Sequence, residues 1–187
     1  MATNAATKKA ISTAFRELLA AESFDQIRVG EICERSGRNR KSFYYHFKDK
    51  YDLVCWIFET EFVTPLREAL LSHDLNFDEI SRHLMLYFYE NRAFYRKILQ
   101  VEGQNSFKEY FGRMVDGYLR ELMGIPEGAR NEDFCVTFYV DAILKSLERW
   151  LLQTPVLPPD IYLDLLRTGL RSFPRSASEV RWWENEK

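Results

Sequence analysis

Apolar residues recur every three or four positions along most of this chain, and short polar or Pro/Gly-containing breaks separate the stretches. That spacing puts the apolar side chains on one face of an α-helix, whereas no segment shows the alternation of a half-buried strand. After two short helices within residues 27–52, the pattern predicts longer ones over about 53–65, 77–90, 93–101, 107–123, 132–153 and 159–173. The chain is therefore expected to be all-α.

An amphipathic first helix precedes these elements, with Thr7 as a possible cap and an end near residues 22–25. It carries the apolar residues Ile11, Ala14, Phe15, Leu18 and Leu19. The helix that begins near Leu53 meets Pro65, which is expected to kink or restart it. After Phe173 the chain is polar apart from Trp182 and Trp183.

A glycine turn is predicted between the two short helices. Gly37 follows the last apolar position of the first, where a left-handed backbone is easily adopted, and the Asn39 side chain is suited to cap the second. Arg40 and Lys41 then occupy the N-terminus of the second helix, which is unfavourable for the helix dipole unless an anion lies nearby. DNA can supply such a partner through its phosphates and the acceptor atoms on its base edges. The alternative is a basic turn that is solvated and has no partner.

The second short helix has two predicted faces. Phe43, Tyr44 and Phe47 occupy the buried one. The outward face carries five polar or aromatic residues, namely Asn39, Arg40, Lys41, Ser42 and Tyr45. This arrangement favours a helix with one packed face and one reading face.

The run of residues around this turn resembles the signature of the TetR/AcrR family of transcriptional regulators: S-G-R-N-R-K-S-F-Y-Y-H-F-K-D-K-Y-D-L. The resemblance implies a three-helix helix-turn-helix DNA-binding domain over residues 1–52, followed by a helical effector-binding and dimerisation domain over 53–187. One position departs from the family pattern, because Arg38 replaces the usual small apolar residue after the turn glycine. We expect its aliphatic stem to lie along Phe43 with the guanidinium in water.

Several residues are predicted to contact DNA. Arg40 and Lys41 have the reach and donors to read guanine edges, Ser42 and Tyr45 suit bases or backbone, and Asn39 suits capping, DNA contact or both. The resemblance implies that a second group of residues contacts DNA phosphates, namely Arg28, Tyr44, Lys48 and Lys50. Residues 1–50 hold ten Lys/Arg against six Asp/Glu, so a net +4 is concentrated in this part of a chain whose overall charge is −2.

Neither catalysis nor a metal site is predicted. The histidines His46, His73 and His83 lack metal-ligand spacing with each other or with cysteine, and no nucleophile-elbow motif occurs, so no enzyme activity, cofactor or metal is expected. The three cysteines, Cys33, Cys55 and Cys135, are predicted to be reduced core residues of a cytoplasmic protein. No apolar run is long enough to span a bilayer, so no membrane partner is expected.

Ten aromatic residues lie between Phe77 and Tyr118. Because the family binds effectors within this middle bundle, the resemblance implies an aromatic cavity for a small, partly apolar molecule; plain core packing is the alternative. The candidate pocket residues are Tyr87, Phe88, Tyr95, Phe107, Tyr110, Phe111 and Tyr118.

The last two predicted helices have more apolar positions than one packed face needs. On the final helix, Ile161, Leu165 and Gly169 form one stripe, and Tyr162, Leu166, Leu170 and Phe173 form another. In the family such helices pair across a homodimer, while burial within a monomer is the alternative. The predicted interface comprises Phe138, Leu147, Trp150, Leu151, Ile161, Leu165 and Leu166.

The expected function is therefore sequence-specific regulation of transcription by a homodimer on a near-palindromic double-stranded DNA operator. Repression relieved by a small-molecule effector is the usual family pattern. The segment W-L-L-Q-T-P-V-L-P-P also resembles a subgroup that contains activators of dihydroxyacetone kinase operons, which leaves activation and a protein co-regulator open. From a different class, a helical ligand-binding or protein-interaction module without DNA specificity predicts no sequence preference and a shallow salt dependence.

Overall fold

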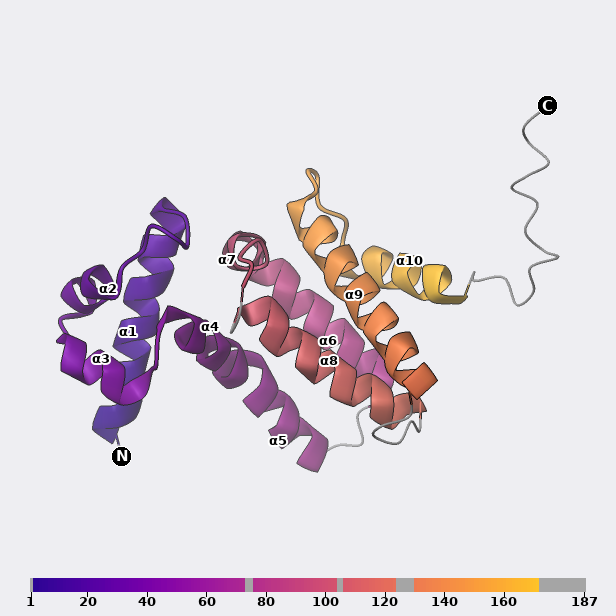
Figure 1. Ribbon diagram of the computed structural model, residues 1–187, viewed down its shortest axis with the longest axis horizontal. Helices are drawn as coiled ribbons and strands as arrows, with labels where there is room; N and C mark the ends of the chain where they lie inside the picture. Colours follow the sequence, from indigo (N-terminus) through magenta and orange to yellow (C-terminus); the bar gives the residue numbers. More distant parts are fainter. Residues whose placement is uncertain (1, 73–75, 104–105, 124–129, 172–187) are drawn as a thin grey trace.

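A computed structural model describes residues 2–72, 76–103, 106–123 and 130–171. Within these ranges the chain forms ten α-helices and one π-helical segment and contains no strand, so the all-α prediction is confirmed. Figure 1 shows α1, α2 and α3 gathered at one end of the molecule and α6 to α10 forming a bundle at the other. The predicted helix end at Phe173 and the Trp182–Trp183 tail lie outside the described residues.

The N-terminal head consists of α1 (Ala2–Ala21), α2 (Val29–Ser36) and α3 (Arg40–His46). Ile11, Phe15 and Leu19 from α1 are almost fully buried, together with Phe43 of α3, as the helical spacing predicts. The predicted start of α1 is wrong: Thr7 is a buried residue inside the helix and not its cap. The alanine-rich residues before it carry the helix further back because alanine has the highest helix propensity.

A nearly continuous helical segment leads from the head to the bundle: α4 (Lys50–Phe58), a π-helical segment η1 (Glu59–Val63) and α5 (Thr64–Ser72). Pro65 lacks an N–H and its ring crowds the carbonyl four residues earlier, so a regular α-helix is disfavoured there. The chain responds one turn earlier, where the N–H of Thr64 donates to the carbonyl of Glu59. Pro65 therefore lies just after a π-helical segment, and such a segment is a common cause of bending in a long helix.

The bundle contains α6 (Phe77–Glu90), α7 (Arg92–Ile98), α8 (Phe107–Met123), α9 (Arg130–Leu152) and α10 (Pro159–Arg171). Its predicted ranges agree with these bounds to within a few residues. α8 packs on α9 and α10 packs on α6 (Figure 1). Trp150 fixes the corner between the last two helices, because its ring stacks on Tyr162 at 4.2 Å and its Nε1 donates to the carbonyl of Leu157.

Aromatic rings fill the middle of the bundle. Phe58 of α4 is fully buried at the centre. Seven rings lie within about 6 Å of its own, namely Phe62, Tyr87, Phe88, Tyr95, Phe107, Tyr110 and Phe111. Six of the seven predicted pocket residues thus pack on Phe58: Phe88, Tyr95, Phe107 and Phe111 are buried, whereas Tyr87 and Tyr110 are half-buried. The seventh, Tyr118, stacks on Phe77 at the surface, so these seven side chains do not surround one shared cavity.

Lysine 97 ties the bundle to the head. Its Nζ donates to the carbonyls of Leu19, Ala20 and Glu22, at 2.6, 3.1 and 3.0 Å. Two of these oxygens belong to the last turn of α1 and the third to the residue directly after it. The C-terminal end of a helix has unsatisfied acceptors and a partial negative charge. Phe15 of α1 also meets Phe94 of α7 edge to face. The head is therefore packed directly against α7 as well as joined to the bundle through α4.

Candidate nucleic-acid interface

The turn between α2 and α3 has the predicted geometry. Gly37 adopts a left-handed backbone with φ of 65°, and its N–H and that of Arg38 donate to carbonyls at the end of α2. Asn39 is extended, and its Oδ1 accepts a hydrogen bond of 2.8 Å from the N–H of Ser42. Both predictions for this turn are confirmed. The cap fixes where α3 begins, and hence which of its side chains point outward.

The outward face of α3 is strongly exposed. Arg40 and Lys41 lie in solvent at the first turn, and Tyr45 one turn later is 79% exposed, while Phe43 is fully buried beneath them. The prediction that Tyr44 belongs to the buried face is wrong, because its side chain is 56% exposed and only the ring edge meets Phe43. Tyr44 extends the exposed face and remains available for the backbone contact that was expected of it.

Arg40 does not extend freely from α3. Its Nη2 lies only 2.8 Å from the position that a Cβ would occupy on Gly30 of α2. The absence of a side chain at Gly30 therefore creates the space in which the Arg40 guanidinium lies. α2 and α3 together set the orientation of the residue that was predicted to read bases.

Two of the predicted phosphate contacts are exposed on either side of α3. Arg28 stands at the N-cap of α2, where its N–H donates to Glu31 at 2.7 Å and leaves its guanidinium exposed. Lys48 follows α3, and its N–H donates to Asp52 at 2.9 Å while its ammonium remains in solvent. In both residues the backbone is held by a hydrogen bond, and no hydrogen bond or ion pair joins the cation to a described residue, which suits a contact to a phosphate.

Lys50 differs from this prediction. Its Nζ donates to the carbonyls of Phe24, Asp25 and Ile27, at 2.6, 3.3 and 3.0 Å, and lies over the Phe24 ring. Burial lowers the pKa of Lys50, and the charge of Asp25 partly offsets that effect. All three protons of the ammonium have acceptors in the loop between α1 and α2, so Lys50 holds this loop and is removed from the phosphate-contact set.

Two further cations lie near α3 and were absent from the predicted set. Lys8 of α1 places its Nζ 5.6 Å from the centre of the Phe47 ring, directly after α3. Burial, followed by the charge of Lys8, lowers the pKa of His46. Lys8 and α3 are far apart in the sequence, so no local sequence pattern indicates that Lys8 lies beside this helix. Arg38 is exposed in the turn itself and was interpreted only as a packing residue.

The cysteine prediction is correct for only part of the set. Cys33 is buried and Cys55 is half-buried, but Cys135 is exposed on α9 and is not a core residue. Burial raises the pKa of the Cys55 thiol to about 12. Across the described ranges, no cluster of three His, Cys, Asp or Glu side chains is arranged to hold a metal ion. No helix in those ranges is both long and apolar enough to cross a membrane.

The predicted dimer interface divides into two groups. Leu147, Trp150 and Leu151 are almost fully buried inside the protomer, so their assignment to an interface is wrong. The remaining residues lie at the surface: Leu166 is half-buried, and Phe138, Ile161 and Leu165 are exposed. As expected, the two stripes of α10 separate, with Tyr162 buried and Ile161 and Leu165 outward, whereas the Leu170 side chain and Phe173 lie outside the described residues. A groove of about 390 Å³ runs between α9 and α10 beside this outward stripe.

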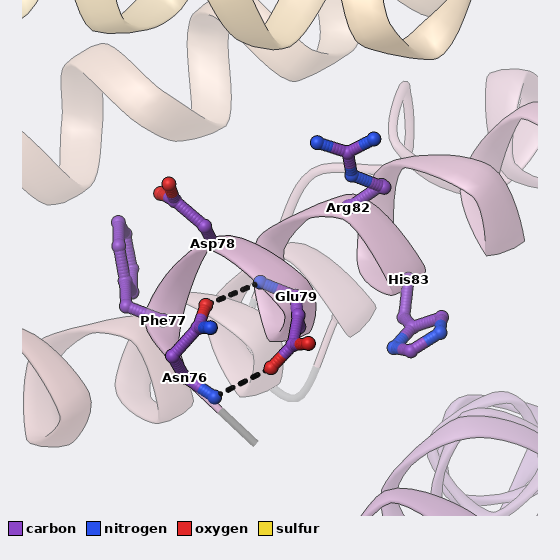
Figure 2. A pocket seen from close by; sticks show the side chains of 6 residues that line it. All are labelled: Asn76, Phe77, Asp78, Glu79, Arg82 and His83. Atoms are coloured by element: carbon purple, nitrogen blue, oxygen red, sulfur yellow. Dashed lines mark hydrogen bonds between the residues drawn. The ribbon is translucent and has the colours of Figure 1, made fainter.

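A second hollow, of about 690 Å³, lies at the start of α6 (Figure 2). Figure 2 shows Asn76 and Glu79 engaged in a reciprocal capping pair, with hydrogen bonds of 3.0 and 2.9 Å. Asp78 and Arg82 point together toward α10, and each has an ion-pair partner there. Because its charged groups are already paired within the chain, this hollow is a helix-to-helix junction rather than a candidate site.

Two family models match the sequence. Residues 11–55 match the model for bacterial regulatory proteins of the tetR family, which spans the head and the start of α4. Residues 76–170 match the model for a transcriptional regulator C-terminal region. The two matches together cover the helix-turn-helix and the bundle.

Individual proteins give the same picture. A curated relative from Lactococcus lactis subsp. lactis (strain IL1403), the HTH-type dhaKLM operon transcriptional activator DhaS, is 30% identical over 108 residues, or 56% of this chain. The match spans about half of that relative, 54% of its length. Two solved structures share the fold. The dihydroxyacetone kinase operon activator DhaS has a TM-score of 0.58 and 23% identity, covering 88% of this chain and 94% of that one. A TetR transcriptional regulator from Streptococcus agalactiae 2603V has a TM-score of 0.67 and 24% identity, covering 90% and 95%.

Proposed function

This chain belongs to the TetR family of bacterial regulatory proteins and is a DNA-binding transcription regulator, and we propose that it binds a near-palindromic operator as a homodimer. One observation carries the proposal. The turn at Gly37 and the cap at Asn39 present Arg40 and Lys41 in solvent at the start of α3, above a fully buried Phe43. A helix that packs one face on the protein core and exposes basic side chains on the other suits the major groove of DNA.

Within each half-site, the residues have separate roles in this proposal. Arg40 and Lys41 donate to guanine acceptors, while Ser42 and Tyr45 contact bases or the adjacent backbone, and Asn39 caps α3 close to the DNA. The exposed side chains of Arg28, Tyr44 and Lys48 bind phosphates on either side of the groove. The phosphate contacts position the head, and the contacts from the first turn of α3 select the sequence.

The proposed dimer forms through α9 and α10. Phe134 and Phe138 on α9, with Ile161 and Leu165 on α10, are large apolar side chains exposed at the surface of one protomer. A second copy covering them removes that apolar area from water, which is the main favourable term in association. Two-fold symmetry then presents two α3 helices to successive turns of the duplex, which accounts for a near-palindromic operator.

We divide the chain into a DNA-binding head, residues 1–52, and an effector-binding and dimerisation body, residues 53–187. In this proposal the dimer represses transcription by occupying its operator, and a small-molecule effector or a protein co-regulator releases it. The effector and the operator oppose each other through one coupling free energy, since each favours a different spacing of the heads. Because aromatic side chains fill the core around Phe58, the effector site lies outside that core.

Activation of transcription is the second candidate. It is favoured by the relative from Lactococcus lactis, which is named as a transcriptional activator. The two candidates share the same DNA contacts and differ only in the effect of the bound dimer on the promoter. Transcription in vitro from a promoter that carries the recovered operator separates them: added protein lowers transcript yield under the first and raises it under the second.

Selection from a random duplex library near physiological salt tests the proposal. The wild-type protein is expected to enrich an inverted repeat that the Arg40→Ala/Lys41→Ala variant does not. The matched control is Arg67→Ala/Arg96→Ala, which removes two exposed positive charges outside the head and is expected to enrich the same repeat. Equal loss in both variants means that net charge, and not α3, drives binding.

A folded dimer that enriches no sequence contradicts this proposal. That result, together with a shallow dependence of DNA affinity on salt, supports a helical ligand-binding or protein-interaction module without sequence-specific DNA binding.

A further inference from the structure

A groove of about 330 Å³ lies between α6 and the segment formed by η1 and α5. Phe62, Leu66 and Leu86 supply apolar walls, and Leu86 is 43% exposed. α5 has no buried residue along its whole length, so its inner face is open toward α6. The volume is at the lower end of the range for small-molecule sites, about 300–1,000 Å³. A single helical turn, about 10 Å across and 5.4 Å high, has a larger volume, so the size favours a small molecule over a partner helix.

The charge of the lining is one-sided. Two carboxylates, Glu61 and Glu90, line the groove together with His83, and no Lys or Arg is among its described lining residues. Glu90 is exposed on α6 and forms no hydrogen bond or ion pair with any described residue. A largely apolar groove whose lining holds two carboxylates and neither Lys nor Arg suits a ligand that brings its own positive charge.

One of these carboxylates also connects the groove to the head. Oε2 of Glu61 accepts a hydrogen bond of 2.5 Å from the Arg16 guanidinium of α1. It also accepts one of 3.0 Å from the hydroxyl of Tyr87, which lines the groove and is itself 2.8 Å from the hydroxyl of Tyr95. Glu61 lies in the π-helical segment between the head and the bundle. Its ion pair with Arg16 therefore helps to hold α1 against the linking helix.

We propose that this groove binds a small organic cation, an apolar body that ends in an ammonium group, and that the ammonium competes with Arg16 for Glu61. The ammonium donates hydrogen bonds to the carboxylates and lies against the Tyr87 ring, whose face attracts cations. Freed from Glu61, Arg16 no longer joins α1 to η1. The inference rests on the proposed regulator function, because it makes the cation the effector of that regulator, and each ligand then changes the affinity for the other by the same factor.

Titration calorimetry of the full-length protein without DNA tests the site, with 2-phenylethylammonium as the probe. The neutral 2-phenylethanol and the anionic 3-phenylpropanoate have similar apolar bodies and are expected to bind more weakly. Glu90→Gln is expected to weaken binding of the cation by up to about fivefold, the upper end of the range for an exposed ion pair. Glu68→Gln, which removes a carboxylate from α5 outside the groove lining, is the matched control and is expected to bind as wild type does.

Binding of the alcohol as tightly as the ammonium overturns the proposal, and so does an equal effect of Glu90→Gln and Glu68→Gln. The regulatory step is read separately, from operator affinity with and without saturating 2-phenylethylammonium. The wild type is expected to lose operator affinity, while Glu61→Gln, which lacks the contested charge, does not respond. Operator affinity that is unchanged in the wild type overturns the coupling.

The two readouts also separate this inference from the proposed function. A protein that binds the cation but no operator contradicts the regulator proposal. A protein that binds its operator but not the cation contradicts only the groove.

Discussion

The guanidinium of Arg40 lies across Gly30, with Nη2 2.8 Å from the place of the missing Cβ. Gly30→Ala is therefore expected to displace Arg40. The free energy of unfolding changes by less than about 1 kcal/mol, because the displaced group is the end of a flexible side chain and alanine favours the helix. Operator affinity is expected to fall, with the loss concentrated at the base pair that Arg40 contacts. Competition binding with single-base variants of the operator measures this.

Gly117→Ala is the matched control for this substitution. Gly117 is also helical, but nothing lies within 4 Å of an added Cβ, so operator affinity is expected to be unchanged. If Gly30→Ala and wild type discriminate bases equally while Arg40→Ala does not, the contact with Gly30 has no part in recognition.

Lys50→Ala is expected to destabilise the head. Its ammonium satisfies three loop carbonyls, and leaving such acceptors without a donor costs about 1–3 kcal/mol. Urea denaturation measures the change. Lys48→Ala, two residues earlier and exposed, is the control: it is expected to unfold at the wild-type urea concentration but to bind all duplexes more weakly, with a salt slope smaller by about 1. If Lys48→Ala lowers the stability and Lys50→Ala weakens only DNA binding, the structural role of Lys50 is contradicted.

Asn39→Ala is expected to lower the free energy of unfolding by about 1 kcal/mol, because the N–H of Ser42 loses its side-chain acceptor. Operator affinity should also fall, since α3 frays at the end that reads DNA. Asn39→Asp keeps an acceptor oxygen in the same place and adds a negative charge toward the phosphates. Retained stability with reduced DNA affinity in Asn39→Asp therefore separates the cap from any direct contact, whereas full stability of Asn39→Ala excludes the capping role.

Leu165→Glu is expected to convert the proposed dimer to a monomer without unfolding it, because this side chain is 56% exposed on α10. Analytical ultracentrifugation gives the oligomeric state, and circular dichroism checks the fold. Leu71→Glu makes the same chemical change at an 85% exposed position on α5 and should leave the dimer intact. A Leu165→Glu protein that stays dimeric excludes this face.

Leu147→Ala, by contrast, is expected to cost about 2–5 kcal/mol of stability, because Leu147 is a core residue.

Alkylation with iodoacetamide at mildly alkaline pH is expected to modify Cys135 and to spare Cys55. Cys135 is exposed, whereas burial, followed by the charge of Asp52, raises the pKa of Cys55 to about 12 and keeps the thiol protonated. Peptide mass spectrometry identifies the modified residue. Modification of Cys55 at the rate of Cys135 contradicts its burial.

The same shift gives a pH dependence. A thiol whose pKa is higher in the folded than in the unfolded protein, where it is about 8.5, contributes its full stabilisation below that value. The contribution of Cys55 is lost as the pH rises from there toward 12. Replacing Cys55 with serine is expected to remove this part of the alkaline loss of stability, which urea denaturation at a series of pH values measures.

Interactions between residues close together in the chain determine the helices and the turn, so these could be predicted from the sequence. Gly37 and Asn39 act on atoms a few residues away, so their effects on the backbone follow from residue type alone. Helical spacing likewise identified Phe15, Leu19 and Phe43 as positions that face something apolar. What they face is a different question, because periodicity shows that a face is buried but not by which neighbour.

Tertiary structure decided the roles that depend on distant neighbours. Lys50 and Lys48 are alike in the sequence, and only the position of the loop between α1 and α2 makes one a structural donor and leaves the other in solvent. Leu147 and Leu165 both occupy apolar helix faces, yet one packs inside the protomer and the other points outward. The contacts of Lys97 with α1 and of Arg16 with Glu61 join segments separated by tens of residues, and no local pattern encodes them. Helix formation is determined by neighbours along the chain, whereas the burial of a charge or the opening of a groove is determined by which helices the fold brings together.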